Sequence, residues 1–272
     1  NPSLVPYTFL SKINNISEEF DDKKNYYFIS SLNAAYYHRW FDGMIYLYHV
    51  SISKEKPVLL VPVKIPDSIK NLLYKFKDDF EIKYVSNRFI KLPKTFKFTH
   101  VSWAKDGPVI TKRISQYFKS KILNETTRIK TFEKFFIDRK DKTTRKILNN
   151  NEVINVFKEK GFKVLYLEEY SIEEQAHLFY NAKVIAGIHG AGLTNLIFCK
   201  EGTKVIELQN LVNVTTYFTI SIQLDLDYHY ILPNEFEYRN IEDPYNERKK
   251  FFKQKLKHTS YNILEIKQKI KY

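Results

Sequence analysis

The residues best suited to chemistry follow a short apolar stretch in the second half of the chain. Lys183–Ile188 is predicted to be a buried strand, and a glycine turn and a helix start follow it directly: His189, Gly190, Ala191, Gly192, Leu193, Thr194 and Asn195. The free N–H groups of such a turn, with a helix dipole behind them, bind phosphate oxygens, and glycine lets the backbone approach closely. The alternative is a tight strand–helix turn that binds nothing.

Polar side chains extend the same predicted edge of a sheet. His189 stands at the carboxyl end of its strand, where α/β sheets bind ligands, and could bond a phosphate or a sugar oxygen. Glu207 lies near the end of the next strand, Lys204–Leu208, and fits either an exposed strand end or a ligand to a ribose or sugar hydroxyl. Thr194 and Asn195 lie in the first helical turn, where they could reach phosphate or simply cap the helix.

A second group of candidate residues lies earlier in the chain. Arg139 follows a predicted strand at Phe135–Ile137, and its planar guanidinium suits a diphosphate because it can donate two hydrogen bonds. A helix is predicted at Thr143–Lys160, and the spacing i, i+4, i+7 puts three of its polar residues on one face: Arg145, Asn149 and Glu152. That face indicates either part of a diphosphate site or a solvated stripe with a local Arg–Glu pair.

Alternating elements must position these residues. In the second half of the chain we expect strands at 135–137, 163–167, 183–188 and 204–208, and helices at 143–160, 172–181 and 193–199. Such alternation predicts a parallel sheet covered on both faces. Ser171 and Glu174 form the sequence pattern of a capping box at the start of one helix. The first half is predicted to mix helices at 34–47, 67–76 and 108–123 with strands at 57–63 and 81–85.

Composition narrows the class of protein. The 272 residues are 43% hydrophobic and 28% charged, which is enough apolar surface for a folded core and excludes intrinsic disorder. No run approaches the ~18 apolar residues of a membrane-spanning helix. The single cysteine, Cys199, excludes an intrachain disulfide and a zinc site built from cysteines. Five of the seven glycines fall between residues 161 and 202, which indicates tight turns or a close approach of the backbone in that region.

The net charge of +13 indicates an anionic partner. Residues 245–272 contain nine lysines and arginines against two glutamates, so this segment supplies +7 of the total. Apolar residues recur in it at helical spacing: Phe252, Leu256, Ile263, Ile266 and Ile270. We expect a terminal helix that packs its apolar stripe on the body, or a contact with an anionic membrane or another polyanion. The two readings are compatible, because one face can pack while the other attracts.

In their order along the chain, these motifs resemble those of the glycosyltransferase 61 family, the DUF563 group. The family includes O-GlcNAc transferases, plant xylosyl- and arabinosyltransferases, and bacterial surface-polysaccharide enzymes. The similar stretches are 136–139, 145–149, 161–164, 170–175, 189–195 and 202–208, and an aromatic–histidine segment at 36–42 matches as well. One departure is that Asp138 and Lys140 flank Arg139, where the family often has paired arginines.

The resemblance implies an α/β fold of the GT-B type, with two Rossmann-like domains facing each other across a cleft. Residues 1–125 would form the acceptor-side domain, residues 126–240 the nucleotide-sugar domain, and residues 241–272 a basic helical segment that packs back on the body. It implies an inverting glycosyltransferase that moves a sugar from a nucleotide-sugar, a UDP-sugar by preference, to a glycan or glycoconjugate hydroxyl in surface polysaccharide synthesis. No cofactor and no obligatory metal are implied.

Inverting transfer then assigns roles to residues. A base must deprotonate the acceptor hydroxyl, and cationic or N–H groups must stabilise the departing diphosphate. For the base we expect His38 or Asp42, which share a helix face at i, i+4; the alternative is a structural His–Asp contact. The donor is expected to be bound by Arg139, Arg145, Asn149, Glu168, His189, Gly190, Ala191, Gly192, Leu193, Thr194, Asn195 and Glu207.

Glu168 and an Asp-x-Asp segment supply further acidic side chains. Glu168 is included because it follows the strand at 163–167, where nucleotide-binding domains of this type contact the base and ribose. Asp225 and Asp227 resemble the Asp-x-Asp metal motif of the other large glycosyltransferase fold. They have no glycine-rich strand–helix unit of their own, and motifs this short arise often by chance. We therefore expect no metal site.

The expected partners are a nucleotide-sugar donor, a glycan or lipid-linked acidic glycan acceptor, and an anionic membrane touched by residues 245–272. The expected location is cytoplasmic, with a peripheral contact at the inner membrane face. The alternative function is a non-catalytic Rossmann-like module that binds a polyanion or nucleic acid. Its signature would be basic residues interleaved with stacking aromatics along a groove. The first half has those residue types without a recognisable motif, so nucleic acid is not expected.

Overall fold

The computed structural model describes residues 20–21, 23–29, 32, 35–53, 55–85, 96–99, 109–123, 128–140, 146–210, 214–238 and 256–270. The chain divides into two compact units, Asn1–Ser102 and Trp103–Tyr272. The expected class, a mixed α/β chain with parallel sheets, is confirmed in both units. Within the described residues, no helix combines the length and the apolar character needed to cross a membrane.

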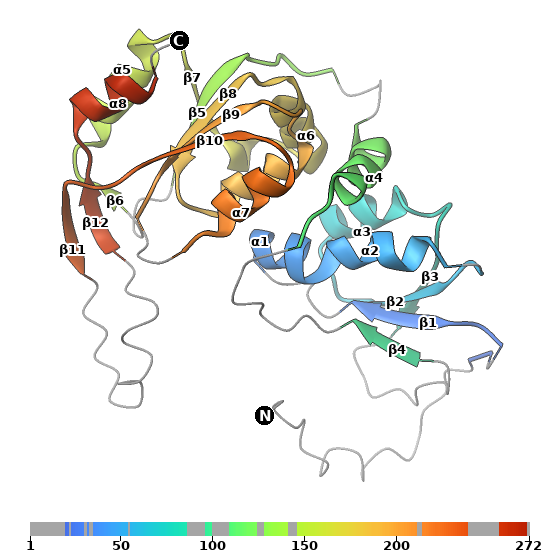
Figure 1. Cartoon of the computed structure of the whole chain (residues 1–272). Helices are drawn as coiled ribbons and strands as arrows, with labels where there is room; N and C mark the ends of the chain where they lie inside the picture. Colours follow the sequence, from blue (N-terminus) through green and yellow to red (C-terminus); the bar gives the residue numbers. More distant parts are fainter. Residues whose placement is uncertain are drawn as a thin grey trace, which may run out of the picture. The chain divides into compact units, whose positions relative to one another are not determined.

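The first unit is built on a four-stranded sheet with strand order β3-β2-β1-β4. Its strands are all parallel: β1 (Tyr26–Ile29), β2 (Val58–Pro62), β3 (Glu81–Val85) and β4 (Phe96–Thr99). Its helices are α1 (Tyr36–Arg39), the π-helical turn η2 (Trp40–Met44), α2 (Ile45–Ser51) and α3 (Asp67–Tyr74) (Figure 1). The strands predicted at 57–63 and 81–85 and the helices predicted at 34–47 and 67–76 are confirmed, whereas β1 and β4 were not predicted.

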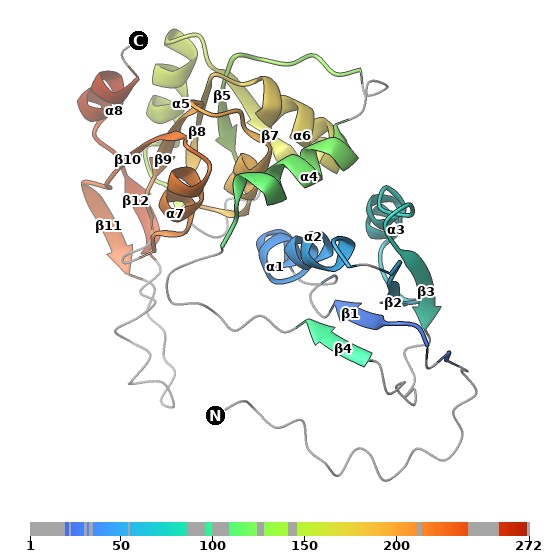
Figure 2. The same ribbon diagram turned by 45° about the vertical axis from the view of Figure 1, so that its right-hand side comes forward.

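The second unit contains a five-stranded, fully parallel sheet with strand order β10-β9-β8-β5-β7. Its strands are β5 (Lys134–Asp138), β7 (Lys163–Tyr166), β8 (Val184–Ile188), β9 (Lys204–Leu208) and β10 (Asp227–Ile231). The helices around it are α4 (Lys112–Ile122), α5 (Asn150–Glu159), α6 (Ile172–Asn181), α7 (Thr216–Gln223) and two 3-10 helices, η3 (Leu167–Glu169) and η4 (Ala191–Phe198) (Figures 1 and 2).

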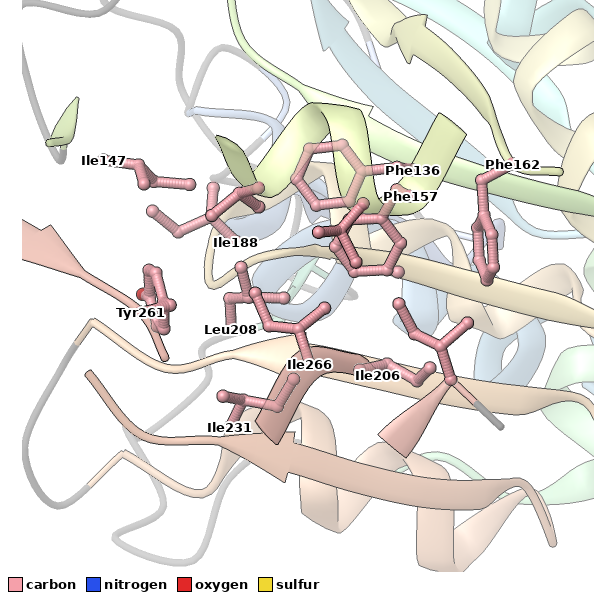
Figure 3. Packing of buried hydrophobic residues seen from close by; sticks show 14 residues of the cluster. Phe136, Ile147, Phe157, Phe162, Ile188, Ile206, Leu208, Ile231, Tyr261 and Ile266 are labelled. Atoms are coloured by element: carbon pink, nitrogen blue, oxygen red, sulfur yellow. The ribbon is translucent and has the colours of Figure 1, made fainter. Parts of the chain in front are cut away.

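Alternation along the strands divides the core of the second unit into two layers. Phe136 of β5, Ile206 of β9 and Ile231 of β10 belong to the cluster that packs under α5 (Figure 3). Phe135, the neighbour of Phe136 in sequence, packs instead on Phe179 of α6, with ring centroids 5.2 Å apart. Both faces of the parallel sheet are therefore covered by helices, as the alternation of elements predicted.

A short three-stranded sheet joins distant parts of the second unit. It has the order β11-β12-β6, with β11 at Glu235–Tyr238, β12 at Leu256–Ser260 and β6 at Lys146–Ile147. The last helix, α8 (Ile263–Lys269), follows β12, and the second unit's core buries Tyr261, Ile266 and Ile270 (Figure 3). The C-terminal segment thus packs on the body, but helix begins only at Ile263. Residues 256–260 form a strand, so Leu256 belongs to no helical stripe.

Three predicted helices differ from the structure. The helix expected from Thr143 begins at Asn150, because residues 146–147 pair with β12 and the Leu148 N–H donates to the Thr259 carbonyl at 2.7 Å. Asn149 therefore precedes the helix that contains Glu152, so these two residues do not share one helix face. The helix expected at 193–199 is the 3-10 helix η4. The helix expected at 108–123 is α4, capped by Thr111.

Helix α4 packs on η4 and α6 of the second unit. The hydroxyl of its Ser115 donates to the Ile197 carbonyl at 2.6 Å. Contacts thus divide the chain between residues 102 and 103, whereas the sequence-based division lies after residue 125. The predicted capping box of α6 is confirmed: the Ser171 hydroxyl accepts from the Glu174 N–H at 3.2 Å, and the Glu174 carboxylate accepts from the Ser171 N–H at 2.7 Å.

Candidate functional site

The parallel sheet of the second unit brings several polar residues to one edge. Strand β8 lies between β5 and β9, so the carboxyl ends of these three strands are neighbours. Arg139 follows β5, His189 follows β8, and Gln209 and Asn210 follow β9. The carboxyl edge of a parallel sheet is where α/β folds bind ligands. The structure therefore gathers two of the predicted donor-binding residues, Arg139 and His189, at this edge.

His189 and Glu207 form a buried pair there. The imidazole Nδ1 of His189 is hydrogen-bonded to one carboxylate oxygen of Glu207, and the Tyr228 hydroxyl donates to the other at 2.5 Å. Glu207 is 0% exposed and His189 is buried. The reading of Glu207 as an exposed strand end is therefore wrong; α7 packs on the neighbouring strand β10 and on η4. Both of its oxygens are already bound by the protein, so the structure does not offer them to a ribose hydroxyl.

The Tyr228 hydroxyl is fixed as a hydrogen-bond donor to Glu207. Burial, followed by the neighbouring Glu207 carboxylate, raises the pKa of Tyr228. Its oxygen also accepts from the Gln209 side-chain amide at 3.3 Å. The His189 ring lies against Tyr217 of α7, with ring centroids 5.0 Å apart. Two aromatic side chains therefore enclose the His189–Glu207 pair.

The glycine turn is tighter than its sequence indicated. The Leu193 N–H donates to the Gly190 carbonyl at 3.0 Å, so it is committed within the turn and is not one of the free amides. The N–H groups of Ala191 and Gly192 open the helix, where the helix itself offers them no acceptor. A Cβ on Gly192 would lie 3.0 Å from the Leu167 side chain and 3.3 Å from that of Ile137, so a larger residue here would have to displace these neighbours.

The first-turn residues Thr194 and Asn195 have different roles. Both are completely buried. The Asn195 amide donates to the Gln175 side chain at 2.8 Å and to the Gly192 carbonyl at 3.2 Å, which ties η4 to α6. The Thr194 hydroxyl is buried and makes no hydrogen bond in the part of the chain that the structure describes. Of these two residues, it is therefore Thr194 whose side chain can form a further hydrogen bond.

Arg139 and Asn210 carry further unsatisfied polar atoms. The Nη1 atom of Arg139 is buried without a hydrogen-bond partner among the described residues, although the neighbouring Lys140 pairs with Glu169 at 2.8 Å. Asn210 is 0% exposed, and in the described structure neither its Nδ2 nor its Oδ1 is hydrogen-bonded. Buried polar groups are nearly always paired, so such atoms call for an explanation. Sequence reasoning missed Asn210, whose only signal was its place two residues after a buried strand.

The structure places the remaining predicted donor-binding side chains differently from one another. The Asn149 amide holds the backbone of Tyr261, donating to its carbonyl at 2.9 Å and accepting from its N–H at 3.1 Å. Both of its polar atoms thus serve the packing of the C-terminal segment, and its role in donor binding stays a prediction. Glu168 lies exposed in η3, directly after β7. Arg145 lies outside the described residues.

The two candidates for the base lie in the first unit. His38 lies in α1 and Asp42 in η2. The Nδ1 atom of His38 is 2.6 Å from the Asp42 carboxylate, and both side chains are half-buried. The predicted i, i+4 pairing is therefore present across α1 and η2. A carboxylate on one imidazole nitrogen leaves the other nitrogen, Nε2, as the atom that can take up a proton.

The Asp-x-Asp segment has other partners. Asp225 pairs with Lys112, and Asp227 lies 2.9 Å from Nε2 of His229. Asp227 begins β10, so the segment lies at the amino edge of the sheet, opposite His189. Within the ranges that the structure describes, no three histidine, cysteine or acidic side chains are grouped as metal ligands would be.

Comparisons with known proteins agree with the motif pattern. The family model "Glycosyltransferase 61" matches residues 36–206. An EGF domain-specific O-linked N-acetylglucosamine transferase of Canis lupus familiaris is 33% identical over 82 residues, which is 28% of this chain and 16% of that protein. The Gallus gallus protein of the same name is also 33% identical over 82 residues, which is 28% of this chain and 15% of the relative.

A plant protein is similar over a shorter stretch. The alpha-1,3-arabinosyltransferase XAT3 of Oryza sativa subsp. japonica is 37% identical over 68 residues, which is 24% of this chain and 12% of that protein. The chain thus spans about a sixth or less of the length of the curated relatives that it matches.

Proposed function

The chain belongs to the glycosyltransferase 61 family, and from this premise we propose that it transfers a sugar from a nucleotide-sugar, specifically a UDP-sugar, to a hydroxyl of a glycan or glycoconjugate. The second unit would bind the donor at the carboxyl edge of its sheet. The first unit would bind the acceptor, in an arrangement of the GT-B type. The acceptor would be a surface polysaccharide or a lipid-linked acidic glycan, to which the charge of +13 is suited.

The single observation that carries this proposal is the group of unsatisfied polar atoms at that edge. The Arg139 guanidinium, the Thr194 hydroxyl and the Asn210 amide each have a buried atom for which the described residues provide no hydrogen bond. An unpaired buried group costs about 1–3 kcal/mol, so several together favour a ligand that pairs them. A nucleotide-sugar offers diphosphate oxygens to Arg139 and Thr194, and hydroxyls that both donate to and accept from Asn210.

The proposed reaction is a single inverting displacement. His38, oriented by Asp42, would accept the proton of the acceptor hydroxyl at Nε2 as the hydroxyl oxygen bonds to the anomeric carbon. The bond between that carbon and the diphosphate oxygen breaks in the same step, and UDP departs with the electron pair. Arg139 and the opening N–H groups of η4 would stabilise the developing negative charge. These groups supply the positive charge that the departing diphosphate requires, so the proposal needs no metal.

Calorimetric titration with UDP, CMP and GDP, at two salt concentrations and with chelator present, tests the proposal. We expect micromolar binding of UDP that changes little with salt. Arg139→Ala should weaken it by at least about tenfold, which is 1.4 kcal/mol. The matched control is Lys140→Ala, because Lys140 is the neighbouring cation and already pairs with Glu169.

The opposing result would be equally informative. If no nucleotide binds, and the chain instead binds nucleic acid tightly with a steep dependence on salt, the polyanion-binding module replaces the transferase. The peripheral contact with an anionic membrane through residues 245–272 is a separate part of the proposal. Sedimentation with vesicles of neutral and of anionic phospholipid tests it, with binding to the anionic vesicles alone as the expected result.

A further inference from the structure

We infer that Glu207 acts on the donor through His189: its carboxylate fixes the His189 imidazole in one tautomer and one orientation at the donor-binding edge. The inference rests on the proposed function for the identity of the donor. It changes the expected role of Glu207 from a ligand of sugar or ribose hydroxyls to a positioning residue. The ring nitrogen that Glu207 does not hold is then His189 Nε2.

Strand pairing places the two residues so that they meet. In the parallel pair β8–β9, Gly187 is in register with Glu207, and His189 lies two residues further along its strand direction. The His189 N–H donates to the Leu208 carbonyl at 2.9 Å, so β9 holds the backbone of His189 as well. With the backbone and the Nδ1 atom both bound to β9, the ring has one orientation.

The surroundings of Glu207 exclude a direct contact with the donor. Its side chain is 0% exposed, and its two oxygens are taken by His189 Nδ1 and by the Tyr228 hydroxyl. Because the pKa of Tyr228 is raised by burial and then by this carboxylate, the hydroxyl keeps its proton and donates. The Gln209 amide donates in turn to the Tyr228 oxygen, which directs the O–H toward Glu207.

Hydrogen-bonding chemistry then determines the tautomer. A carboxylate can only accept hydrogen bonds, so the Nδ1 atom of His189 must carry a hydrogen. In a neutral imidazole the other nitrogen, Nε2, then has the lone pair. Glutamine at position 207 would offer an N–H as well as an oxygen, and this tautomer would no longer be imposed.

The test combines nitrogen NMR of the full chain with UDP titration. With ¹⁵N-labelled histidine, the His189 signals are identified by their loss in His189→Gln. We expect wild-type His189 to carry its neutral-form hydrogen on Nδ1, and Glu207→Gln to shift the signals toward the Nε2–H form. In that variant UDP affinity should fall by about tenfold. Glu201→Gln is the matched control, because Glu201 pairs with Lys112 at the opposite edge of the sheet.

The outcomes separate this inference from the proposed function. A wild-type His189 with its hydrogen on Nε2 overturns the inference without any variant, even if Glu207→Gln does not fold. Loss of UDP affinity in Glu207→Gln with an unchanged tautomer also overturns it, since Glu207 would then contact the donor itself. If Glu207→Gln shifts the tautomer but the wild-type chain binds no UDP, the positioning of His189 by Glu207 is supported. The proposal that UDP-sugars are the donor is then rejected.

Discussion

Asn149 shows how one side chain can fix a distant segment. Its amide donates to the carbonyl of Tyr261 and accepts from the N–H of the same residue, 112 positions along the chain. This is the pairing that a neighbouring strand would supply to Tyr261. The residue therefore continues, with a side chain, the backbone ladder that β6 and β12 begin.

We predict that Asn149→Ala destabilises the chain without weakening nucleotide binding. The variant leaves a half-buried N–H and carbonyl of Tyr261 unpaired, which costs about 2 kcal/mol. Urea denaturation measures the loss, and titration with UDP under native conditions should give the wild-type Kd. Asn151→Ala is the matched control, because Asn151 is exposed in the first turn of α5. Weakened UDP binding at unchanged stability would return Asn149 to the donor site.

The candidate site could be predicted from the sequence only in part. Arg139 and His189 follow apolar strands, and a parallel sheet brings such strand ends together, so sequence alone indicated them. Spacing does not show what a polar atom already bonds. Asn195 and Glu207 lie at the predicted places, yet Gln175 and Tyr228, from other elements, occupy their polar atoms. Asn210 was missed because nothing local distinguishes a buried asparagine from a loop asparagine.

At the scale of elements, part of the basic C-terminal segment belongs to the hydrophobic core of the second unit. Helix α8 is short, but it follows β12 directly and packs against α5. Tyr261 and Ile266 are buried in the same cluster as Phe136 and Phe157 of the main sheet and α5. The end of this segment therefore completes the second unit's hydrophobic core, whatever its lysines bind.

We predict opposite results for two apolar residues of α8. Ile266 is 0% exposed, so Ile266→Ala should lower the free energy of unfolding by about 2–5 kcal/mol through lost contacts and a cavity. Leu264 is 69% exposed in the same helix, and Leu264→Ala should change stability by less than about 0.5 kcal/mol. Urea denaturation of both variants provides the comparison. Equal effects would mean that α8 does not pack as the structure shows.

Elements with strong local patterns were predictable, and those that depend on distant partners were not. The bounds of β3, α6 and β9 match the prediction, because a local apolar pattern or a capping box defines them. Strand β6 has two residues, and its pairing partner β12 lies more than a hundred residues away. No local sequence pattern predicts such a strand. For this reason the predicted helix began at Thr143, whereas the helix in the structure begins at Asn150.

Over the whole molecule, tyrosines that the fold partly or fully shields from water connect stability to alkaline pH. Burial is the largest cause that raises the pKa of Tyr166, Tyr228 and Tyr261, and nearby carboxylates raise each one further. A raised pKa means that the folded chain holds a proton that the unfolded chain releases near its ordinary value of about 10. These tyrosines contribute their full stability below about pH 10, and the contribution declines as pH rises above it.

Tyr261 isolates this effect because its hydroxyl donates to the Gln209 carbonyl at 2.8 Å inside the core. Near pH 8, Tyr261→Phe should cost about 1 kcal/mol, the net value of a typical hydrogen bond. Above pH 10 the unfolded wild type releases this proton while the folded wild type retains it, and this lowers the stability of the wild type alone. The difference in free energy of unfolding between the wild type and Tyr261→Phe should therefore shrink by up to about 1.4 kcal/mol per pH unit and then reverse.

Urea denaturation of both chains between pH 8 and pH 11 measures this difference. The loss of lysine charge in this +13 chain affects both equally and cancels. Tyr230→Phe is the matched control, since Tyr230 is 52% exposed, and its difference from wild type should stay constant. A constant difference for Tyr261→Phe as well would show that this hydroxyl meets water in the folded chain, which would contradict the packing of the C-terminal segment on the sheet.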